Sequence, residues 1–177
     1  KRELIKKNKT HIKEFSKKFK FYTIDDILYR KIRDNELTHD KFIETNKILF
    51  KKKKFIYNKS INKLLIDKKN LLSLSDSDHT LGLHSHTHPT NFKDLNYKEQ
   101  FVEFSKNKVI MEKIIKKKIN SASYPCGSFN KNTKDILKRL NIDIAFIQIQ
   151  NKNFSIKNIN KYEIPRIDHT YLKDLTI

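Results

Sequence analysis

Apolar and polar residues follow two different periods along the chain. Between Phe19 and Thr23 they alternate with a period of two, which predicts a strand that ends at Asp25–Asp26. Short apolar runs predict four further strands, at residues 54–57, 80–84, 121–124 and 142–149. Longer stretches with helical spacing separate these runs.

Three of the longer stretches are predicted to be helices. The first is expected from about Thr38, a side chain suited to an N-cap, and its apolar stripe ends at Phe50. Asn96, with Glu99 three residues later, has the pattern of a capping box and opens the longest helix. The third stretch includes Leu137.

Strands that alternate with helices predict an α/β fold with a mainly parallel sheet, either open or rolled into a barrel. The 177 residues match the length of one domain, and no repeat or low-complexity linker divides them. We therefore expect a single domain over residues 1–177. In such folds active sites collect at the carboxyl ends of the strands, so candidate chemistry is expected there.

The formal net charge of +19 comes mainly from lysine. Such a charge attracts polyanions such as nucleic acid, anionic lipid or acidic glycan. The lysines are scattered through every segment, however, and the aromatic residues fall on apolar stripes rather than beside them. No specific nucleic-acid partner is therefore expected, and the oligomeric state stays open.

The single cysteine, Cys126, excludes an internal disulfide. No apolar run approaches the ~20 residues that cross a bilayer, so no transmembrane segment is expected. A cytoplasmic location is the resulting expectation. The first residue is Lys1 rather than Met, so a signal or anchor before it stays open.

Glycine and proline are rare, with two and three copies in the whole chain. These residues permit or impose backbone conformations that other residues avoid, so their positions mark loops of demanding shape. They define three loops, at Gly82–Pro89, Pro125–Gly127 and Pro165–Arg166. We take these as candidate site loops.

The first loop contains His84, His86 and His88. If the chain turns into a helix here, His84 and His88 lie one turn apart and can bind one cation, while His86 points elsewhere. If the chain stays extended, all three imidazoles lie on one side. A polar turn with incidental histidines is the third interpretation. We expect a metal site, because three of the seven histidines fall within this loop.

The pair Asp25–Asp26 follows the first expected strand. A hydrolytic metal site usually has a third protein ligand besides two imidazoles, and open positions for water and substrate. One carboxylate of the pair can face the metal while its neighbour takes a proton from the attacking water. An N-cap or a surface turn explains the same pair equally well.

The second loop, Pro125–Gly127, encloses Cys126. A tight Pro-x-Gly turn exposes the backbone N–H of Cys126, which can donate to the oxyanion of a tetrahedral intermediate. We expect the thiol to pack as a small apolar group rather than to act as a nucleophile or a metal ligand.

Three segments together resemble the motifs of the polysaccharide deacetylase family, also called the NodB homology family or carbohydrate esterase family 4. Residues 78–89 contain its His-Ser/Thr-x-x-His motif, and residues 123–130 are similar to its Tyr-Pro-x-Gly-Ser-x-Asn motif. Residues 23–26 resemble its opening Thr-Phe-Asp-Asp. The resemblance extends from Phe19 to Ile167.

The resemblance implies a role for each matching residue. It makes Asp25 the general base and Cys126 the backbone donor to the oxyanion, and the ligands of one divalent ion would be Asp26, His84 and His88. It implies an irregular (β/α) barrel with an incomplete set of strands, and Zn²⁺ as the ion, with Co²⁺, Mn²⁺ and Ni²⁺ as alternatives. The implied reaction removes an N-acetyl or O-acetyl group from an amino sugar or a polysaccharide precursor.

The sequence departs from the family pattern at three places. Ile27 stands where the family has a glycine, and the arginine that usually opens the third motif is missing. We expect Arg166 to hold Asp25 in its place. The late Leu-to-His motif, which supplies the catalytic acid, is not recognisable, and His169 is the expected substitute.

Besides a nucleic-acid-binding domain, which only the charge suggests, two functions therefore stay open. The first is a deacetylase, and the Ile-Asp-Asp-Ile form of residues 24–27 resembles a subgroup associated with bacterial surface polysaccharides such as O-antigen or capsule. The second is a weakly active or inactive family member that binds glycans. Ile27 and the missing acid favour the second.

Overall fold

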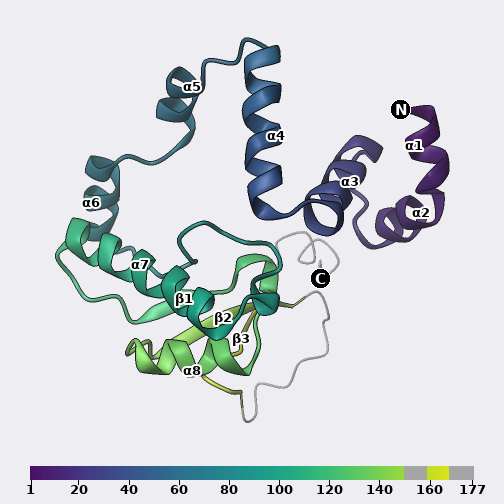
Figure 1. The fold of residues 1–177 in the computed structure, drawn as a ribbon. Coiled ribbons are helices and arrows are strands. Elements are labelled where there is room, and N and C mark those ends of the chain that lie inside the picture. Colours follow the sequence, from purple (N-terminus) through teal and green to yellow (C-terminus); the bar gives the residue numbers. More distant parts are fainter. Residues whose placement is uncertain (150–158, 168–177) are drawn as a thin grey trace, which may run out of the picture. The chain divides into compact units, whose positions relative to one another are not determined.

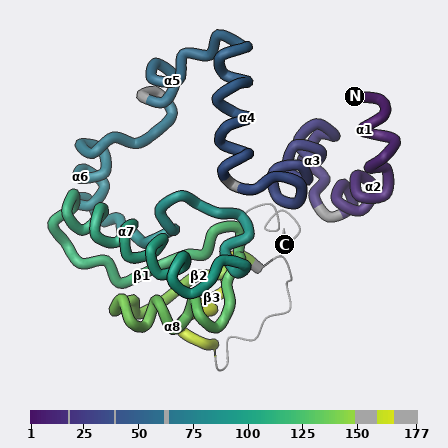
Figure 2. Tube along the Cα trace, in the orientation of Figure 1, coloured from purple at the N-terminus to yellow at the C-terminus, as the bar shows by residue number. Residues whose placement is uncertain are grey.

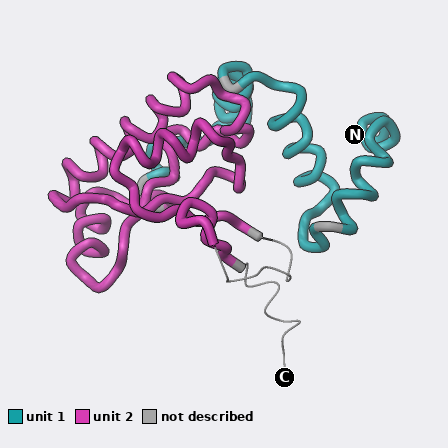
Figure 3. Tube along the Cα trace, turned by 90° about the horizontal axis from the view of Figure 1, so that it is seen from below, with its two compact units in different colours: residues 1–63 teal, residues 64–177 magenta. Residues whose placement is uncertain are grey.

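The computed structural model describes residues 1–149 and 159–167 of the chain. The chain divides into two compact units, residues 1–63 and residues 64–177 (Figures 1 and 3). Unit 1 is helical, whereas unit 2 combines helices with a small parallel sheet.

Unit 1 consists of helices joined by short turns (Figure 2). They are α1 (Arg2–Lys7), α2 (Lys9–Lys18), α3 (Ile24–Lys31), a π-helical turn (Ile32–Glu36), α4 (His39–Lys52) and α5 (Tyr57–Leu64). α2 contacts α3, which buries Ile27 and Leu28. The Arg30 guanidinium lies 4.1 Å from the centre of the Tyr22 ring, which also contacts the ring of Phe15.

The strand expected at residues 19–26 is wrong, because α3 begins at Ile24. Thr23 is the N-cap of α3, and its hydroxyl accepts a hydrogen bond from the N–H of Asp26 at 3.2 Å. Asp26 in turn accepts from the N–H of Thr23 at 3.1 Å, which completes a capping box. These local hydrogen bonds start a helix where the apolar period of two favours a strand.

The helix expected from about Thr38 is confirmed as α4, with Thr38 as its N-cap. The strand expected at residues 54–57 is wrong, because this segment joins α4 to α5. Lys54 has a φ of 51°, in the left-handed region, which reverses the chain there. The rings of Phe50 and Phe55 contact each other across this turn, with centres 4.8 Å apart.

Unit 2 contains a three-stranded sheet in the order β1-β2-β3, and both strand pairs are parallel. Its elements are α6 (Lys68–Asp76), a 3-10 turn (Phe92–Asp94), α7 (Tyr97–Ile115), β1 (Ser121–Ser123), a second 3-10 turn (Pro125–Gly127), α8 (Lys131–Arg139), β2 (Ile144–Ile149) and β3 (Ile164–Ile167). Ala122 of β1 pairs with Ala145 of β2, and Gln148 of β2 pairs with Arg166 of β3. The α/β class with a parallel sheet is confirmed, while closure into a barrel stays a prediction.

A further extended segment lies beside β1. The N–H of Leu83 donates to the carbonyl of Ser121 at 2.9 Å, and the N–H of Ser123 donates to the carbonyl of Leu83 at 2.8 Å. Gly82 permits this approach, because a Cβ there would lie only 2.9 Å from the Ser121 hydroxyl oxygen. The strand expected at residues 80–84 is thus reduced to a single parallel bridge.

The other helices and strands expected in unit 2 are confirmed. Residues 121–124 and 142–149 contain β1 and β2, and Asn96 with Glu99 forms the capping box of α7. The sequence does not predict β3, because Pro165 suggests the end of a strand. Pro165 instead lies within β3, the last strand of the described sheet, where a missing N–H is tolerated.

The core of unit 2 combines apolar side chains of the sheet, α7 and α8. It consists of Leu83, Phe92, Phe104, Ile115, Ile119, Ala122, Tyr124, Ile136, Leu137, Ile142, Ala145 and Tyr162. A polar pair crosses it between α7 and α8. Gln100, fully buried, donates to the carbonyl of Leu95 at 2.8 Å and accepts from the Thr133 hydroxyl at 2.6 Å. Because an unpaired buried amide is costly, this pair specifies how the two helices meet.

Charged residues interrupt even the longest described helix, α7. Among the helices of residues 1–149 and 159–167, none combines the length and the apolar character needed to cross a membrane.

Tyr124 provides a test of the buried polar contacts. Its hydroxyl donates to the carbonyl of Tyr162 at 2.7 Å. Tyr124→Phe removes this donor, so we expect the free energy of unfolding to fall by about 1–3 kcal/mol in urea titrations. The same change at the exposed Tyr97 is the matched control and should alter it by less than about 0.5 kcal/mol. Equal losses in both variants would contradict this interpretation.

Tyr124 also predicts a dependence of stability on pH. Burial raises the pKa of its phenol above the ordinary value of 10.0, and the charge of Glu163 acts in the same direction. Above about pH 10 the unfolded chain loses this proton while the folded chain keeps it, so the free energy of unfolding falls as pH rises. Alkaline titrations followed by circular dichroism should show a steeper fall for the wild type than for Tyr124→Phe.

Candidate active site

The histidine loop and the turn after β1 meet at one end of the sheet. Leu83 pairs with β1, so that His84 follows at the end where Ser123 leaves the strand. Both segments run parallel, so their carboxyl ends lie together. This is the end at which parallel α/β folds place their sites.

His84 is held by Ser123. Its ring Nδ1 lies 2.9 Å from both the carbonyl oxygen and the hydroxyl oxygen of Ser123. A carbonyl only accepts, so Nδ1 carries the proton and donates it. The lone pair of Nε2 is then directed to the other side of the ring, in the arrangement of metal-binding histidines.

The histidine loop is neither a helical turn nor a strand. Ser85 and His88 have φ values of 63° and 56°, both in the left-handed region, and the N–H of His88 donates to the Ser85 hydroxyl at 3.1 Å. The loop nevertheless brings together the pair expected from a helix. The ring centres of His84 and His88 lie 4.9 Å apart, with an angle of 58° between the ring planes.

His84 favours the neutral form. Desolvation by the surrounding protein lowers its pKa below the ordinary value of 6.5, against the hydrogen bond to Ser123, which raises it. The charges of His88 and Arg166 lower it further. A neutral imidazole is the form that binds a cation, so this shift is compatible with the expected role of His84, which stays a prediction.

The turn after β1 is tied to the segment that follows the histidine loop. The N–H of Lys93 donates to the Ser128 hydroxyl at 3.0 Å, and the Asn130 amide donates to the carbonyl of Lys93 at 2.6 Å. Asn130 also caps α8. The segment 123–130 is therefore held by side-chain hydrogen bonds to Lys93, four residues after the end of the histidine loop.

A family model described as polysaccharide deacetylase matches residues 12–145, more than half of the chain. The chain belongs to the polysaccharide deacetylase family. The match includes residues of both units. The resemblance seen in the sequence is thereby confirmed.

The first of three similar solved structures supports the fold. The Streptococcus pyogenes deacetylase PplD, in complex with acetate, is 20% identical with a TM-score of 0.52, over 58% of this chain and 44% of that chain. A mutant pseudoenzyme of the CE4 family with restored activity is 24% identical with a TM-score of 0.42, over 44% of this chain and 28% of that chain. A de-N-acetylase from Aggregatibacter actinomycetemcomitans is 13% identical with a TM-score of 0.45, over 63% of this chain and 53% of that chain.

The chain thus spans less than half the length of the streptococcal deacetylase. A comparison with curated proteins found no match.

In this member of the polysaccharide deacetylase family, the segment that resembles the opening motif lies in unit 1, on the first turn of α3. The Thr23 hydroxyl also donates a hydrogen bond to Oδ2 of Asp26 at 2.6 Å. Hydrogen bonds from the Thr23 hydroxyl and N–H lower the pKa of Asp26 below 3.8, so its carboxylate is charged at neutral pH. Asp25 forms an exposed ion pair with Lys1 at 2.6 Å.

The two units hold different parts of the expected site. Among the described residues, neither unit gathers three histidine, cysteine, aspartate or glutamate side chains suited to one metal ion. The paired imidazoles of unit 2 fit a borderline divalent ion such as Zn²⁺, which needs further ligands. That Asp26 supplies one of them stays a prediction.

The remaining expected residues have different positions. Cys126 is exposed in the turn Pro125–Gly127 and has a φ of 52°, so its backbone adopts the demanding shape that the flanking proline and glycine indicate. The charge of Arg166 in β3 lowers the pKa of His84. Its expected contact with Asp25 stays a prediction. His169 lies outside the described residues.

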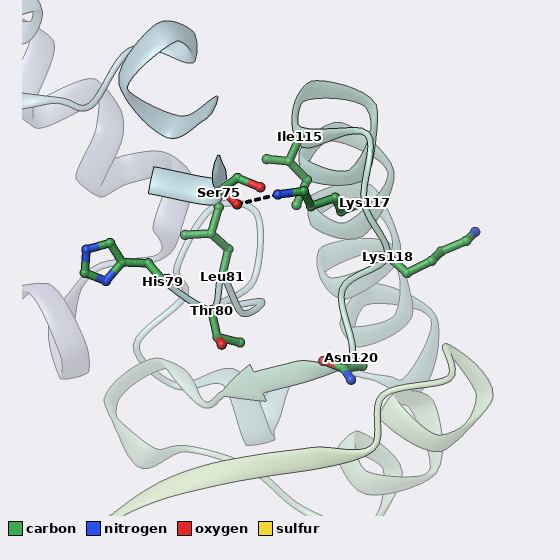
Figure 4. A pocket seen from close by; sticks show the side chains of 8 residues that line it. All are labelled: Ser75, His79, Thr80, Leu81, Ile115, Lys117, Lys118 and Asn120. Atoms are coloured by element: carbon green, nitrogen blue, oxygen red, sulfur yellow. Dashed lines mark hydrogen bonds between the residues drawn. The ribbon is translucent and has the colours of Figure 1, made fainter. Parts of the chain in front are cut away.

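A cavity of about 160 Å³ lies at the opposite end of the parallel segments. Its lining includes His79 and Thr80, which precede the bridge at Leu83, and Asn120, which precedes β1 (Figure 4). Lys117 points across it and donates to the carbonyl of Ser75. This cavity is therefore separate from the candidate active site.

Sequence reasoning missed the polar partners of the histidine loop. Glu103 and Asn107 of α7 accept hydrogen bonds from its backbone. Their spacing of four residues, on a helix that follows the loop, is the available signal. It does not identify the donors, because those are backbone groups.

The tautomer of His84 is a direct test of this geometry. In the metal-free protein above the histidine pKa, we expect His84 to carry its proton on Nδ1, as detected by long-range ¹H–¹⁵N correlation spectra. His86, in the same loop, is the internal reference. A proton on Nε2 of His84 would contradict the contact with the Ser123 carbonyl.

Proposed function

We propose that the chain is a metal-dependent carbohydrate deacetylase. The observation that carries this proposal is the pair of imidazoles of His84 and His88, with the Nδ1 of His84 engaged by Ser123. Membership of the polysaccharide deacetylase family supports the type of reaction. The substrate would carry an N-acetyl or O-acetyl group on an amino sugar or polysaccharide precursor.

Asp26, His84 and His88 would hold the proposed ion. The N–H and the hydroxyl of Thr23 both donate to Oδ2 of Asp26, so these contacts use one carboxylate oxygen and coordination would use the other. Its charge and the neutral form of His84 suit one divalent ion, with Zn²⁺ first and Co²⁺, Mn²⁺ and Ni²⁺ as alternatives. Such an ion supplies Lewis acidity toward a carbonyl and lowers the pKa of water.

The other residues move protons or hold the oxyanion in this proposal. Asp25 takes a proton from the attacking water, and Arg166 holds Asp25. When the water attacks the acetyl carbonyl carbon, the backbone N–H of Cys126 donates to the oxyanion that forms on the carbonyl oxygen. The bond from that carbon to nitrogen then breaks, the nitrogen takes a proton from His169, and acetate and a free amino sugar result.

The proposal extends to the closure of the fold into a barrel and to the class of substrate. The bridge at Leu83 and the strands β1–β3 would form part of an irregular (β/α) barrel, in keeping with the likeness to the streptococcal deacetylase. The Ile-Asp-Asp-Ile form of residues 24–27 favours a precursor of a bacterial surface glycan, such as O-antigen or capsule, as the substrate.

A second candidate is a glycan-binding member of the family with weak or no activity. Two observations favour it. Ile27, in the place of the family's glycine, is fully buried and serves the packing of unit 1. Asp26 already has a structural role as part of a capping box.

Metal content separates the site from incidental histidines. We expect the purified protein to bind about one Zn²⁺ or Co²⁺ per chain, measured by calorimetry and by elemental analysis after dialysis. His84→Ala and His88→Ala should each abolish this binding, while His86→Ala, the matched control from the same loop, should retain it. Equal metal content in all three variants would refute the site.

Acetate release separates the two candidate functions. We expect the zinc-loaded protein to release acetate from N-acetylated amino-sugar oligomers, and Asp25→Asn to retain zinc but lose about 10²–10⁴-fold in rate. Asp40→Asn, an exposed carboxylate of unit 1, is the control and should keep the wild-type rate. Stoichiometric zinc with glycan binding but without acetate release would favour the second candidate.

A further inference from the structure

One carboxylate fastens the histidine loop to α7. Glu103 Oε2 accepts hydrogen bonds from the N–H of His86 at 2.9 Å and from the N–H of Thr87 at 2.8 Å. Its Oε1 accepts from the Thr87 hydroxyl at 2.8 Å. Both carboxylate oxygens therefore accept hydrogen bonds from two consecutive residues, and these residues lie between His84 and His88.

One turn farther along α7, Asn107 holds the start of the same loop. Its Oδ1 accepts from the N–H of His84 at 3.1 Å. Residues four apart lie on one face of a helix, so Glu103 and Asn107 present their acceptors side by side. The loop is thus attached at its first histidine and again between the two histidines.

These attachments act on a loop whose backbone is unfavourable by itself. Ser85 and His88 are both in the left-handed region, where non-glycine residues are held only if the surroundings impose the conformation. Hydrogen bonds to an ionised carboxylate are shorter and stronger than those between neutral groups. The Glu103 carboxylate accepts three such hydrogen bonds from this loop.

We propose that Glu103 is a positioning residue that presets the spacing of the His84 and His88 imidazoles for ion binding. This inference rests on the proposed function, because it assigns Glu103 a role in the affinity of the metal site. Glu103 binds the backbone between the ligands and acts through them. Its loss loosens the loop first and weakens ion binding as a result.

The experiment compares four proteins: the wild type, Glu103→Ala, Glu103→Gln and Glu99→Ala. Glu99→Ala is the matched control, since it removes a carboxylate from the same helix but one that caps Asn96 rather than the histidine loop. The first measurement is amide hydrogen exchange by NMR in the metal-free proteins. We expect exchange at His86 and Thr87 to be at least about tenfold faster in Glu103→Ala and unchanged in Glu99→Ala.

The second measurement is zinc affinity by calorimetry or chelator competition. We expect Glu103→Ala to bind Zn²⁺ about 10–100-fold more weakly, the range found when groups that orient metal ligands are removed. Glu103→Gln should recover most of the affinity, because its amide oxygen can accept from both N–H groups. Glu99→Ala should bind zinc as the wild type does, whatever it loses in stability.

A milder variant covers the case in which Glu103→Ala does not fold. Thr87→Val removes one of the three hydrogen bonds at an exposed position, and a smaller loss of zinc affinity is expected. Wild-type zinc affinity in Glu103→Ala, or in Thr87→Val where Glu103→Ala does not fold, overturns the role of Glu103 but leaves the proposed function intact. A wild type that binds no zinc overturns both.

Discussion

The arrangement of the candidate site depends on the pairing of Leu83 with β1. Two backbone hydrogen bonds, to Ser121 and from Ser123, place one residue of a loop in the sheet. Gly82 makes this approach possible because a side chain at that position would collide with Ser121. Because His84 directly follows Leu83, this pairing brings it beside Ser123. From this position its ring makes the hydrogen bond that orients it.

Helix α7 contributes both to the core of unit 2 and to the candidate site. Its fully buried side chains, Gln100 and Phe104, face the core, and Gln100 is joined to Thr133 of α8. Glu103 and Asn107, on another face of the same helix, accept from the histidine loop. Asn130, which caps α8, also reaches Lys93 after that loop. The conformation of the loop is therefore supported by the same helices that form the core of unit 2.

Unit 1 shows how one short motif can serve two physical roles. The capping box of Thr23 and Asp26 begins α3, and it also keeps the Asp26 carboxylate ionised. Ile27 directly after it is buried, so the residue that departs from the family pattern serves the packing of this unit. A motif associated with chemistry thus has a complete structural explanation within unit 1, and its part in catalysis depends on its meeting the histidines of unit 2.

The sequence by itself determined the features that rest on local interactions. The capping box of α7, the N-cap of α4, and the helix around Leu137 depend on residues within one or two turns, and all were predictable. The His84–His88 pair was predicted from a rare cluster of histidines. The helix at Asp25–Asp26 is also local, because Thr23 and Asp26 cap it, although the apolar period of two favours a strand. The tertiary structure decided β3 despite Pro165, and the contacts of Glu103, Asn107 and Ser123 with the loop. Those contacts join backbone groups to side chains 16 to 39 residues away, and every residue has such backbone groups, so the sequence does not mark which of them is used.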